Sequence, residues 1–150
     1  MIDGMKADPN AMVTTPGLRC DYEAYNSFVE DRLAGRVGGT TVVFSNSHNA
    51  LYFSKEVIPY TGKKYVANEE VPVFHHVGLY AYRPEALEKY MGFNAGPLEE
   101  LEGLEQLRFL ENDIPIRVVE VDAAGRVFWE LNNPIDVERV ESALIRMGIA

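Results

Sequence analysis

The sequence predicts an α/β fold: a three-layer domain built on a mixed sheet. Segments with strand and helix patterns are interleaved along all 150 residues, without an internal repeat or a linker. Two pairs of neighbouring strand candidates are each joined by a short polar turn, which is typical of antiparallel hairpins. Hairpins interspersed with helices favour a mixed sheet that is covered by helices. A chain of this length is expected to form one domain, residues 1–150.

The first part of the chain carries two helix patterns around one short strand. Residues 1–8 have the pattern of a helix, and residues 11–15 that of a strand. Along residues 20–33, apolar side chains recur at helical spacing. Asp21 is a suitable N-cap for this helix, and Gly35 a suitable stop.

The middle of the chain is rich in strand signals. Residues 40–44 and 50–54 are β-branched and aromatic runs joined by a polar stretch, which predicts a hairpin. Residues 73–83 form the longest strand candidate. Alternation along this strand places His75 on one face and a mainly aromatic set on the other: Phe74, His76, Gly78, Tyr80 and Tyr82. That face is either a packed aromatic surface with one satisfied histidine or a surface that a ligand can approach at Gly78.

The second half predicts two further helices and a second hairpin. Residues 84–90 have a helical pattern with proline in the first turn. Residues 114–121 and 126–131 are strand-like and joined by a turn, which predicts an antiparallel pair. Residues 135–147 have the pattern of a last helix, with Asn133 as its N-cap.

Residues 97–110 organise the chain, because a leucine stands at every third position. On one continuous helix these leucines would wind around a broad arc and be largely buried: Leu98, Leu101, Leu104, Leu107 and Leu110. Glu105 and Arg108 project into that arc. They are either an ion pair at the edge of a core or part of a site, and the pattern alone favours the ion pair.

Composition excludes several classes of function. The net charge of −9, without a basic cluster, argues against binding to nucleic acid or to an anionic membrane. Cys20 is the only cysteine, so an internal disulfide is excluded and a reducing compartment is favoured. No apolar run is long enough to span a bilayer, and the first residues lack the pattern of a signal peptide. The expected location is therefore the cytoplasm.

Four ordered segments resemble a known family. They are residues 50–60 with Ala-Leu-Tyr-Phe-Ser-Lys and Ile-Pro-Tyr, residues 76–83, residues 97–108, and residues 133–140. Together they are similar to the C-terminal half, or somewhat more, of 3-deoxy-manno-octulosonate cytidylyltransferase (CMP-Kdo synthetase). The resemblance implies a truncated form of a nucleotidyltransferase-like, mixed-sheet fold that forms a homodimer.

That family transfers CMP from CTP to the acidic sugar Kdo, with Mg²⁺ as cofactor and pyrophosphate as product, in lipopolysaccharide precursor synthesis. The resemblance implies five sugar-contacting residues here: Lys55, His76, Tyr80, Glu105 and Gln106. Lys55 stands where the family usually has arginine, so it keeps the charge but loses the bidentate fork. A sugar acid needs a cation for its carboxylate and polar partners for its hydroxyls, which these residues supply.

Three departures from the family bear on activity. Asn132 stands where the family has a metal-binding aspartate, and Thr41 most simply replaces a lysine. The family's phosphate-cradling loop and its Gln-Gly-Asp-Glu-Pro metal turn, both in its N-terminal half, do not occur in this sequence. Phosphoryl transfer depends on positioning and neutralising the triphosphate, so this chain alone is expected to be inactive, with no catalytic residue of its own.

Three functional hypotheses follow. The first is the sugar-binding and dimerisation half of a cytidylyltransferase, with Asn132 as a weak Mg²⁺ ligand and CTP bound only if an N-terminal half is supplied. The second is a non-catalytic binding or dimerisation module derived from that family. The third is activation of a related acidic or amino sugar.

Overall fold

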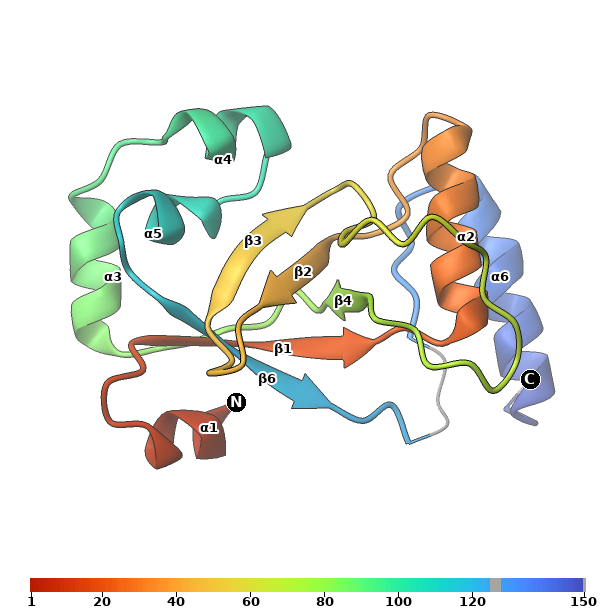
Figure 1. Ribbon diagram of the computed structural model, residues 1–150, viewed down its shortest axis with the longest axis horizontal. Helices are drawn as coiled ribbons and strands as arrows, with labels where there is room; N and C mark the ends of the chain where they lie inside the picture. The colour runs from red at the N-terminus through yellow and green to blue at the C-terminus, as the bar shows by residue number, and fades with distance from the viewer. Residues whose placement is uncertain (125–127, 150) are drawn as a thin grey trace.

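A six-stranded mixed sheet forms the centre of the molecule in the computed structural model, which describes residues 1–124 and 128–149 (Figure 1). The strand order is β3-β2-β4-β1-β5, and β6 also pairs with β1. The strands are β1 (Val13–Arg19), β2 (Thr41–Phe44), β3 (Ala50–Ser54), β4 (Phe74–His76), β5 (Ala81–Tyr82) and β6 (Ile116–Val121). The predicted α/β class with a mixed sheet is confirmed.

The register gives β1 the central place. β6 runs parallel to β1, from Val13 opposite Ile116 to Leu18 opposite Val121. β4 and β5 pair antiparallel with successive parts of β1. β2 and β3 form the first predicted hairpin. The tip of this hairpin reaches β6, where the backbone N–H of Val118 donates to the carbonyl of His48 at 2.8 Å.

The predicted long strand over residues 73–83 is wrong, because it divides into β4 and β5. Pro16 lies opposite this gap and accepts a hydrogen bond from the N–H of Val77, but it has no N–H to return. The hydroxyl of Thr15 instead donates to the carbonyl of Leu79 at 2.8 Å. The hydrogen-bond ladder between β1 and residues 73–83 is therefore interrupted at Pro16. The predicted alternation of side chains still holds, because the rings of His76, Tyr80 and Tyr82 follow one another on one face.

The predicted second hairpin is also wrong. β6 makes its ladder with β1 in parallel, and Phe128–Leu131 are not in a strand. Residue 125 of the predicted turn and residues 126 and 127 of the predicted strand lie outside the described residues. The segment turns instead toward the last helix, where the indole N–H of Trp129 donates to Asp136 at 2.7 Å. A buried side-chain contact has decided the path in place of strand pairing.

The helices gather at the two ends of the sheet (Figure 1). They are α1 (Ile2–Ala7), α2 (Tyr22–Leu33), α3 (Pro84–Met91), α4 (Pro97–Glu102), α5 (Leu107–Glu111) and α6 (Pro134–Arg146). In Figure 1, α2 and α6 lie side by side at one end of the sheet, α3, α4 and α5 lie at the other end, and α1 lies below β1. Both predicted N-caps are confirmed: Asp21 accepts from the N–H of Ala24 at 2.7 Å, and Asn133 caps α6.

The predicted single helix over residues 97–110 is wrong. The chain leaves α4 at Gly103, whose φ of 61° is left-handed, and re-enters a helix only at Leu107. As a result Leu98 and Leu101 are exposed, the latter by 84%, while Leu107 is fully buried. Glycine in the middle of the leucine repeat decides this break, because it adopts the left-handed conformation at no steric cost.

Two apolar clusters stabilise these ends. The larger lies between the sheet and α3–α5 and includes Phe53, Leu107 and Phe109. The smaller lies against α2 and includes Cys20, Phe28 and Val73. Among the described helices, none combines the length and the apolar character that crossing a membrane requires.

Candidate functional site

The end of β3 is joined to α4 through one carboxylate. Glu102 accepts from the hydroxyl of Ser54 at 2.7 Å and from the backbone N–H of Lys55 at 2.9 Å. Lys55 itself is half-buried, and its ammonium makes no ion pair among the described residues. This part of the structure therefore presents a free cation from a fixed backbone, which is what a carboxylate ligand requires.

His76 lies in β4 with its ring buried beside Phe53 and Tyr80. Its Nε2 is 2.9 Å from the hydroxyl oxygen of Thr15. Because that hydroxyl donates its single proton to the carbonyl of Leu79, Nε2 of His76 is the donor in this contact. Burial lowers the pKa of His76 to about 4, so the ring is neutral near pH 7 and its Nδ1 is left as an acceptor.

Tyr80 and Glu105 lie near one another beyond the end of β4. The ring centroid of Tyr80 is 5.5 Å from that of His76. Burial, and then the charges of Tyr82 and Glu105, raise the pKa of the Tyr80 hydroxyl, so it stays protonated and can donate. Glu105 is exposed. The hydroxyl of Tyr80, a donor, and the carboxylate of Glu105, an acceptor, therefore lie near each other at this part of the surface.

Gln106 follows Glu105 and is buried, with 3% of its surface exposed. Its side-chain Nε2 is fully buried and has no hydrogen-bond partner. An unpaired buried amide is unfavourable for the fold, so such a group is often kept for a ligand. Of the five predicted sugar-contacting residues, this one carries the clearest free hydrogen-bonding capacity.

Arg108 has a different partner from the one the sequence suggested. Its guanidinium donates twice to Glu99, at 2.7 and 2.5 Å, and no hydrogen bond to Glu105 is formed. The guanidinium also lies over the ring of Tyr90 at 4.3 Å. The break at Gly103 brings Glu99 into reach of Arg108, and Glu105 is thereby released from the predicted ion pair.

Of the five predicted sugar-contacting residues, Lys55 lines the same recess as Asn132. This recess has a volume of about 380 Å³ and is also lined by Arg36, Thr40 and Glu130. The side-chain amide of Asn132 donates to the carbonyl of Gly38 and to Glu130. Lys55 therefore connects the recess to the α4–α5 turn.

The recess does not fit Mg²⁺ on the strength of these residues. Glu130 is the single carboxylate among its lining residues, and two cations, Arg36 and Lys55, share the space. Mg²⁺ prefers several oxygen ligands and a negative site. Across residues 1–124 and 128–149, no group of three or more His, Cys, Asp or Glu side chains is arranged to hold a metal ion.

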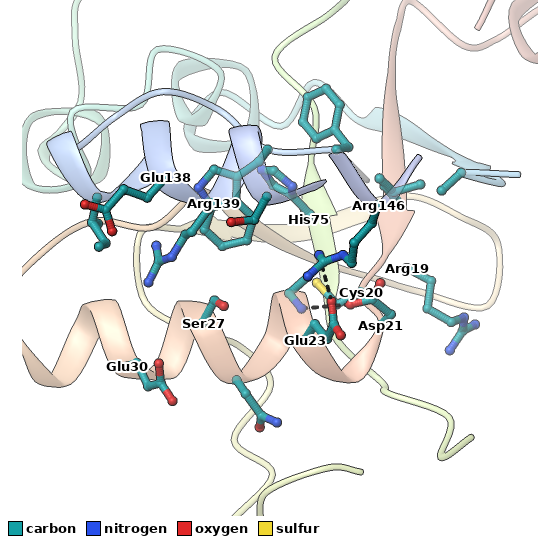
Figure 2. A pocket seen from close by; sticks show the side chains of 18 of the residues that line it. Arg19, Cys20, Asp21, Glu23, Ser27, Glu30, His75, Glu138, Arg139 and Arg146 are labelled. Atoms are coloured by element: carbon teal, nitrogen blue, oxygen red, sulfur yellow. Dashed lines mark hydrogen bonds and ion pairs between the residues drawn. The ribbon is translucent and has the colours of Figure 1, made fainter. Parts of the chain in front are cut away.

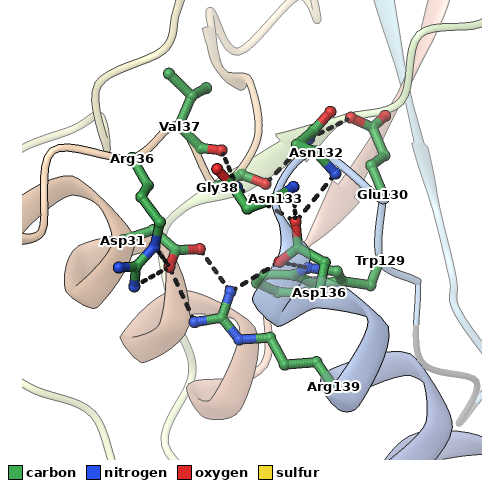
Figure 3. A network of polar contacts seen from close by, with 10 residues as sticks. All are labelled: Asp31, Arg36, Val37, Gly38, Trp129, Glu130, Asn132, Asn133, Asp136 and Arg139. Atoms are coloured by element: carbon green, nitrogen blue, oxygen red, sulfur yellow. Dashed lines mark hydrogen bonds and ion pairs between the residues drawn. The ribbon is translucent and has the colours of Figure 1, made fainter.

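A closed network of charges holds this recess in place (Figure 3). Arg139 of α6 donates to Asp31 of α2 at 2.6 and 3.0 Å, and to Asp136 at 3.0 Å. Arg36 also donates to Asp31, at 2.8 and 3.0 Å. Burial alone would raise the pKa of Asp31, but the hydrogen bonds from Arg139 and Arg36 outweigh it and hold the pKa below its ordinary value.

Asp136 extends the network to the loop that carries Asn132. Its carboxylate accepts from the backbone N–H groups of Asn132 and Asn133, at 3.0 and 2.6 Å, and from Trp129. Asp136 and Arg139 lie in the fourth segment of the family resemblance, residues 133–140, to which the sequence assigned no role. Their helical i, i+3 spacing was a signal, but the partner on α2 is more than 100 residues away and was not visible in the sequence.

A groove of about 940 Å³ between α2 and α6 was also missed by the sequence (Figure 2). Ion pairs bridge the two helices at Asp31–Arg139 and Glu23–Arg146. The groove is lined by His75, which points away from His76 and packs against Phe28 and Phe128. The prediction that neighbouring His75 and His76 face opposite sides of the strand is confirmed, and the two cannot share a ligand.

Comparison with known proteins identifies the family. A family model described as cytidylyltransferase matches residues 25–117. The chain is 42% identical over 144 residues to the 3-deoxy-manno-octulosonate cytidylyltransferase of Maricaulis maris, a match that covers 96% of this chain. The chain belongs to the cytidylyltransferase family. The family resemblance read from the four sequence segments is thereby confirmed.

Two further relatives bear on this cytidylyltransferase chain. A solved structure of CMP:2-keto-3-deoxy-manno-octonic acid synthetase complexed with CTP superposes with a TM-score of 0.69 at 29% identity, covering 97% of this chain and 54% of that one. The 8-amino-3,8-dideoxy-manno-octulosonate cytidylyltransferase of Shewanella pealeana is 41% identical over 103 residues, which cover 69% of this chain and 39% of that relative. The chain spans about half the length of the first curated relatives it matches, 54% and 49%.

Proposed function

We propose that this chain is the sugar-acid-binding part of a CMP-Kdo synthetase-like cytidylyltransferase. The observation that carries the proposal is the buried Nε2 of Gln106, which has no hydrogen-bond partner. Glu102 joins the turn before Gln106 to the backbone of Lys55, and Tyr80 packs beside His76 and lies near enough to Glu105 to feel its charge. The family membership supports the assignment of these residues to a sugar acid.

Each residue offers a different contact to such a ligand. The ammonium of Lys55 would pair with the sugar carboxylate. Nδ1 of His76 and the carboxylate of Glu105 would accept from sugar hydroxyls, and Tyr80 and Nε2 of Gln106 would donate to them. The low pKa of His76 keeps its ring neutral, so it competes with Lys55 for the carboxylate only at acidic pH.

The complete reaction would be CTP plus Kdo giving CMP-Kdo and pyrophosphate. This chain would orient the sugar, while the triphosphate and the Mg²⁺ would be bound mainly by residues that it does not contain. Mg²⁺ would neutralise the triphosphate charge, and Asn132 would contribute at most one neutral oxygen. Alone, the chain is expected to bind Kdo without turning it over, in the cytoplasm where CTP is available.

The experiment that tests this proposal has two stages. Calorimetric titration of the chain with Kdo should show saturable binding that is weakened in Gln106→Ala and His76→Ala. Mixing the chain with a separately expressed N-terminal half of the Maricaulis maris relative should then release pyrophosphate from CTP and Kdo. Absence of Kdo binding, with the chain folded, would contradict the proposed function.

A second candidate function is a non-catalytic assembly module. Asn132 in place of a carboxylate and the two cations in its recess favour this alternative, because they weaken a metal site. Analytical ultracentrifugation of the chain separates the two cases. A stable dimer that binds no sugar acid would favour the assembly module, whereas Kdo binding would favour the enzyme part.

Substrate choice within the class is open to a direct test. The Shewanella relative acts, by its name, on an 8-amino sugar, and the chain is about as similar to it as to the Kdo enzymes over a shorter match. Competition between Kdo and its 8-amino analogue in the same titration would rank the two.

A further inference from the structure

We propose that Glu102 is a positioning residue, which sets Lys55, directly after β3, against the Glu105-Gln106 pair of the α4–α5 turn. The inference rests on the proposed sugar-acid site and assigns a role to a residue that the family resemblance left without one. It starts from the contacts of Glu102, which the structure places against the end of the sheet.

The contacts of Glu102 span two elements that are about 50 residues apart in the chain. Its Oε1 accepts from the hydroxyl of Ser54 at 2.7 Å, and its Oε2 accepts from the backbone N–H of Lys55 at 2.9 Å. Ser54 is buried, and its hydroxyl oxygen also accepts from the N–H of Glu56 at 3.0 Å. The carboxylate therefore fixes the backbone at Lys55 after strand pairing has ended.

Both oxygens of Glu102 accept from these donors, and the charge of Glu102 helps burial to raise the pKa of Tyr52 in β3, so the carboxylate faces the end of β3. Glu102 also takes the backbone N–H of Lys55 and not its ammonium. The side chain of Lys55 is thus held in place at its root while its charge remains available. Glu102 therefore acts on the backbone of Lys55, while the ammonium of Lys55 is the group that would contact a ligand.

The other side of the connection is the turn at Gly103. The N–H groups of Gly103 and Leu104 both donate to the carbonyl of Glu99, which closes the end of α4. A Cβ at Gly103 would lie 3.0 Å from Nζ of Lys55, so the backbone of this turn passes directly beside the ammonium. Only two residues then separate Glu102 from Glu105.

The two parts of the candidate site, Lys55 and the Glu105-Gln106 pair, are therefore both held by Glu102. Lys55 on the β3 side is itself a donor to Glu102, and Glu105 and Gln106 on the turn side follow Glu102 by three and four residues. A carboxylate that accepts two hydrogen bonds defines both distance and orientation, which one hydrogen bond would not. Loss of Glu102 should shift the spacing between the cation and the amide, with the fold retained by the apolar cluster beneath.

The test measures Kdo affinity by calorimetry in Glu102→Ala, Glu102→Gln and the matched control Glu100→Gln, an exposed acid on the same helix. We expect about a tenfold loss in Glu102→Ala, a smaller loss in Glu102→Gln, which keeps one acceptor, and no change in the control. The same series in a Lys55→Ala background should show little further loss from Glu102→Ala, because the two residues act as a unit. Wild-type affinity in Glu102→Ala, or an equal loss in both backgrounds, would overturn the proposal.

A second measurement needs no sugar. In ¹H–¹⁵N spectra, Glu102→Ala should move the amide resonances of both Lys55 and Gln106, while Glu100→Gln should leave both in place. An unmoved Gln106 would overturn the positioning role even where Lys55 shifts. If the wild-type chain binds no Kdo, the proposed function fails, whereas a binding wild type with an unaffected Glu102→Ala variant defeats the positioning role alone.

Discussion

The two ends of the sheet differ in how they hold charged side chains. At the α2–α6 end, Asp31 and Asp136 are fully buried, and each carboxylate is surrounded by donors in a closed network (Figure 3). At the β3–α5 end, the amide of Gln106 has no partner, Lys55 has no ion pair among the described residues, and Glu105 is exposed. Asn26 Oδ1 and His75 Nε2 are also buried without a partner at the α2–α6 end, so the two ends differ in their charged groups and not in unpaired polar atoms.

This difference guides where a site should be sought. A strong buried ion pair is weak evidence for function, because structural networks also shift pKa values and bury charge. The sequence suggested such a pair at Glu105 and Arg108, where the structure instead has a released acid beside an Arg108–Glu99 pair. A released acid beside a buried amide without a partner, more than a buried ion pair, marks the candidate site in this molecule.

The largest expected effect comes from breaking the network. Asp31→Ala leaves Arg139 and Arg36 without their buried partner, and should lower the free energy of unfolding by about 3–5 kcal/mol. Urea denaturation measures this loss. Glu30→Ala, an exposed acid one position earlier on α2, should change stability by less than about 0.5 kcal/mol. A loss below about 1 kcal/mol in Asp31→Ala would contradict the structural role of the network.

The next effect is a pH dependence of the free energy of unfolding, to which His75 and His76 both contribute. Burial lowers the pKa of His75 and of His76 from 6.5 to about 4, so the unfolded chain binds more protons between these values. The stability from the neutral rings is complete above pH 6.5 and is lost as pH falls toward 4, on the order of 3 kcal/mol per histidine. Urea denaturation at pH 7.5 and 4.5 measures the loss.

His75→Phe provides the control for this pH dependence. His75 packs between Phe28 and Phe128 on the α2–α6 side, so a phenyl ring fits its surroundings. The variant should lose about half of the pH dependence and keep its sugar affinity, because His75 faces away from the candidate site. An unchanged slope would show that the carboxylates, and not this histidine, govern acid unfolding.

A smaller pair of effects separates Glu105 from Arg108. Glu105→Gln should weaken Kdo binding by about tenfold, because one charged acceptor is lost, and leave the urea midpoint unchanged. Arg108→Met should lower the midpoint and leave the affinity unchanged, since its contacts are to Glu99 and Tyr90. Calorimetry and denaturation on both variants test this division. If the two variants weakened Kdo binding equally, Glu105 and Arg108 would act as the ion pair that the sequence suggested.

The smallest effect concerns the leucine repeat. Leu101 is 84% exposed, so Leu101→Ser should change the free energy of unfolding by less than about 0.5 kcal/mol. Leu107, six residues later in the same repeat, is fully buried, and Leu107→Ala should lower it by about 2–5 kcal/mol. Urea denaturation of the two variants side by side checks the break at Gly103, since a continuous helix with a buried arc would make their losses similar.

By itself, the sequence determined the α/β class, the helices α2, α3 and α6 with their caps, the first hairpin and the family. These features depend on local periodicity, on caps a few residues away and on ordered motifs, which are all properties of residues close together in the sequence. The opposite orientation of His75 and His76 also follows from alternation alone. The five sugar-contacting residues were named by resemblance, and their role remains a prediction.

Only the tertiary structure decided which polar groups pair and which remain free. Glu99 reaches Arg108 because Gly103 reverses the chain, Asp31 meets Arg139 across 108 residues, and Glu102 reaches Lys55 across 47. Each of these partners is chosen by packing, since a charged side chain forms its contact with whatever the fold brings within about 3 Å. The parallel pairing of β6 and the gap at Pro16 were decided in the same way, by strands that are distant in sequence and neighbours in the sheet.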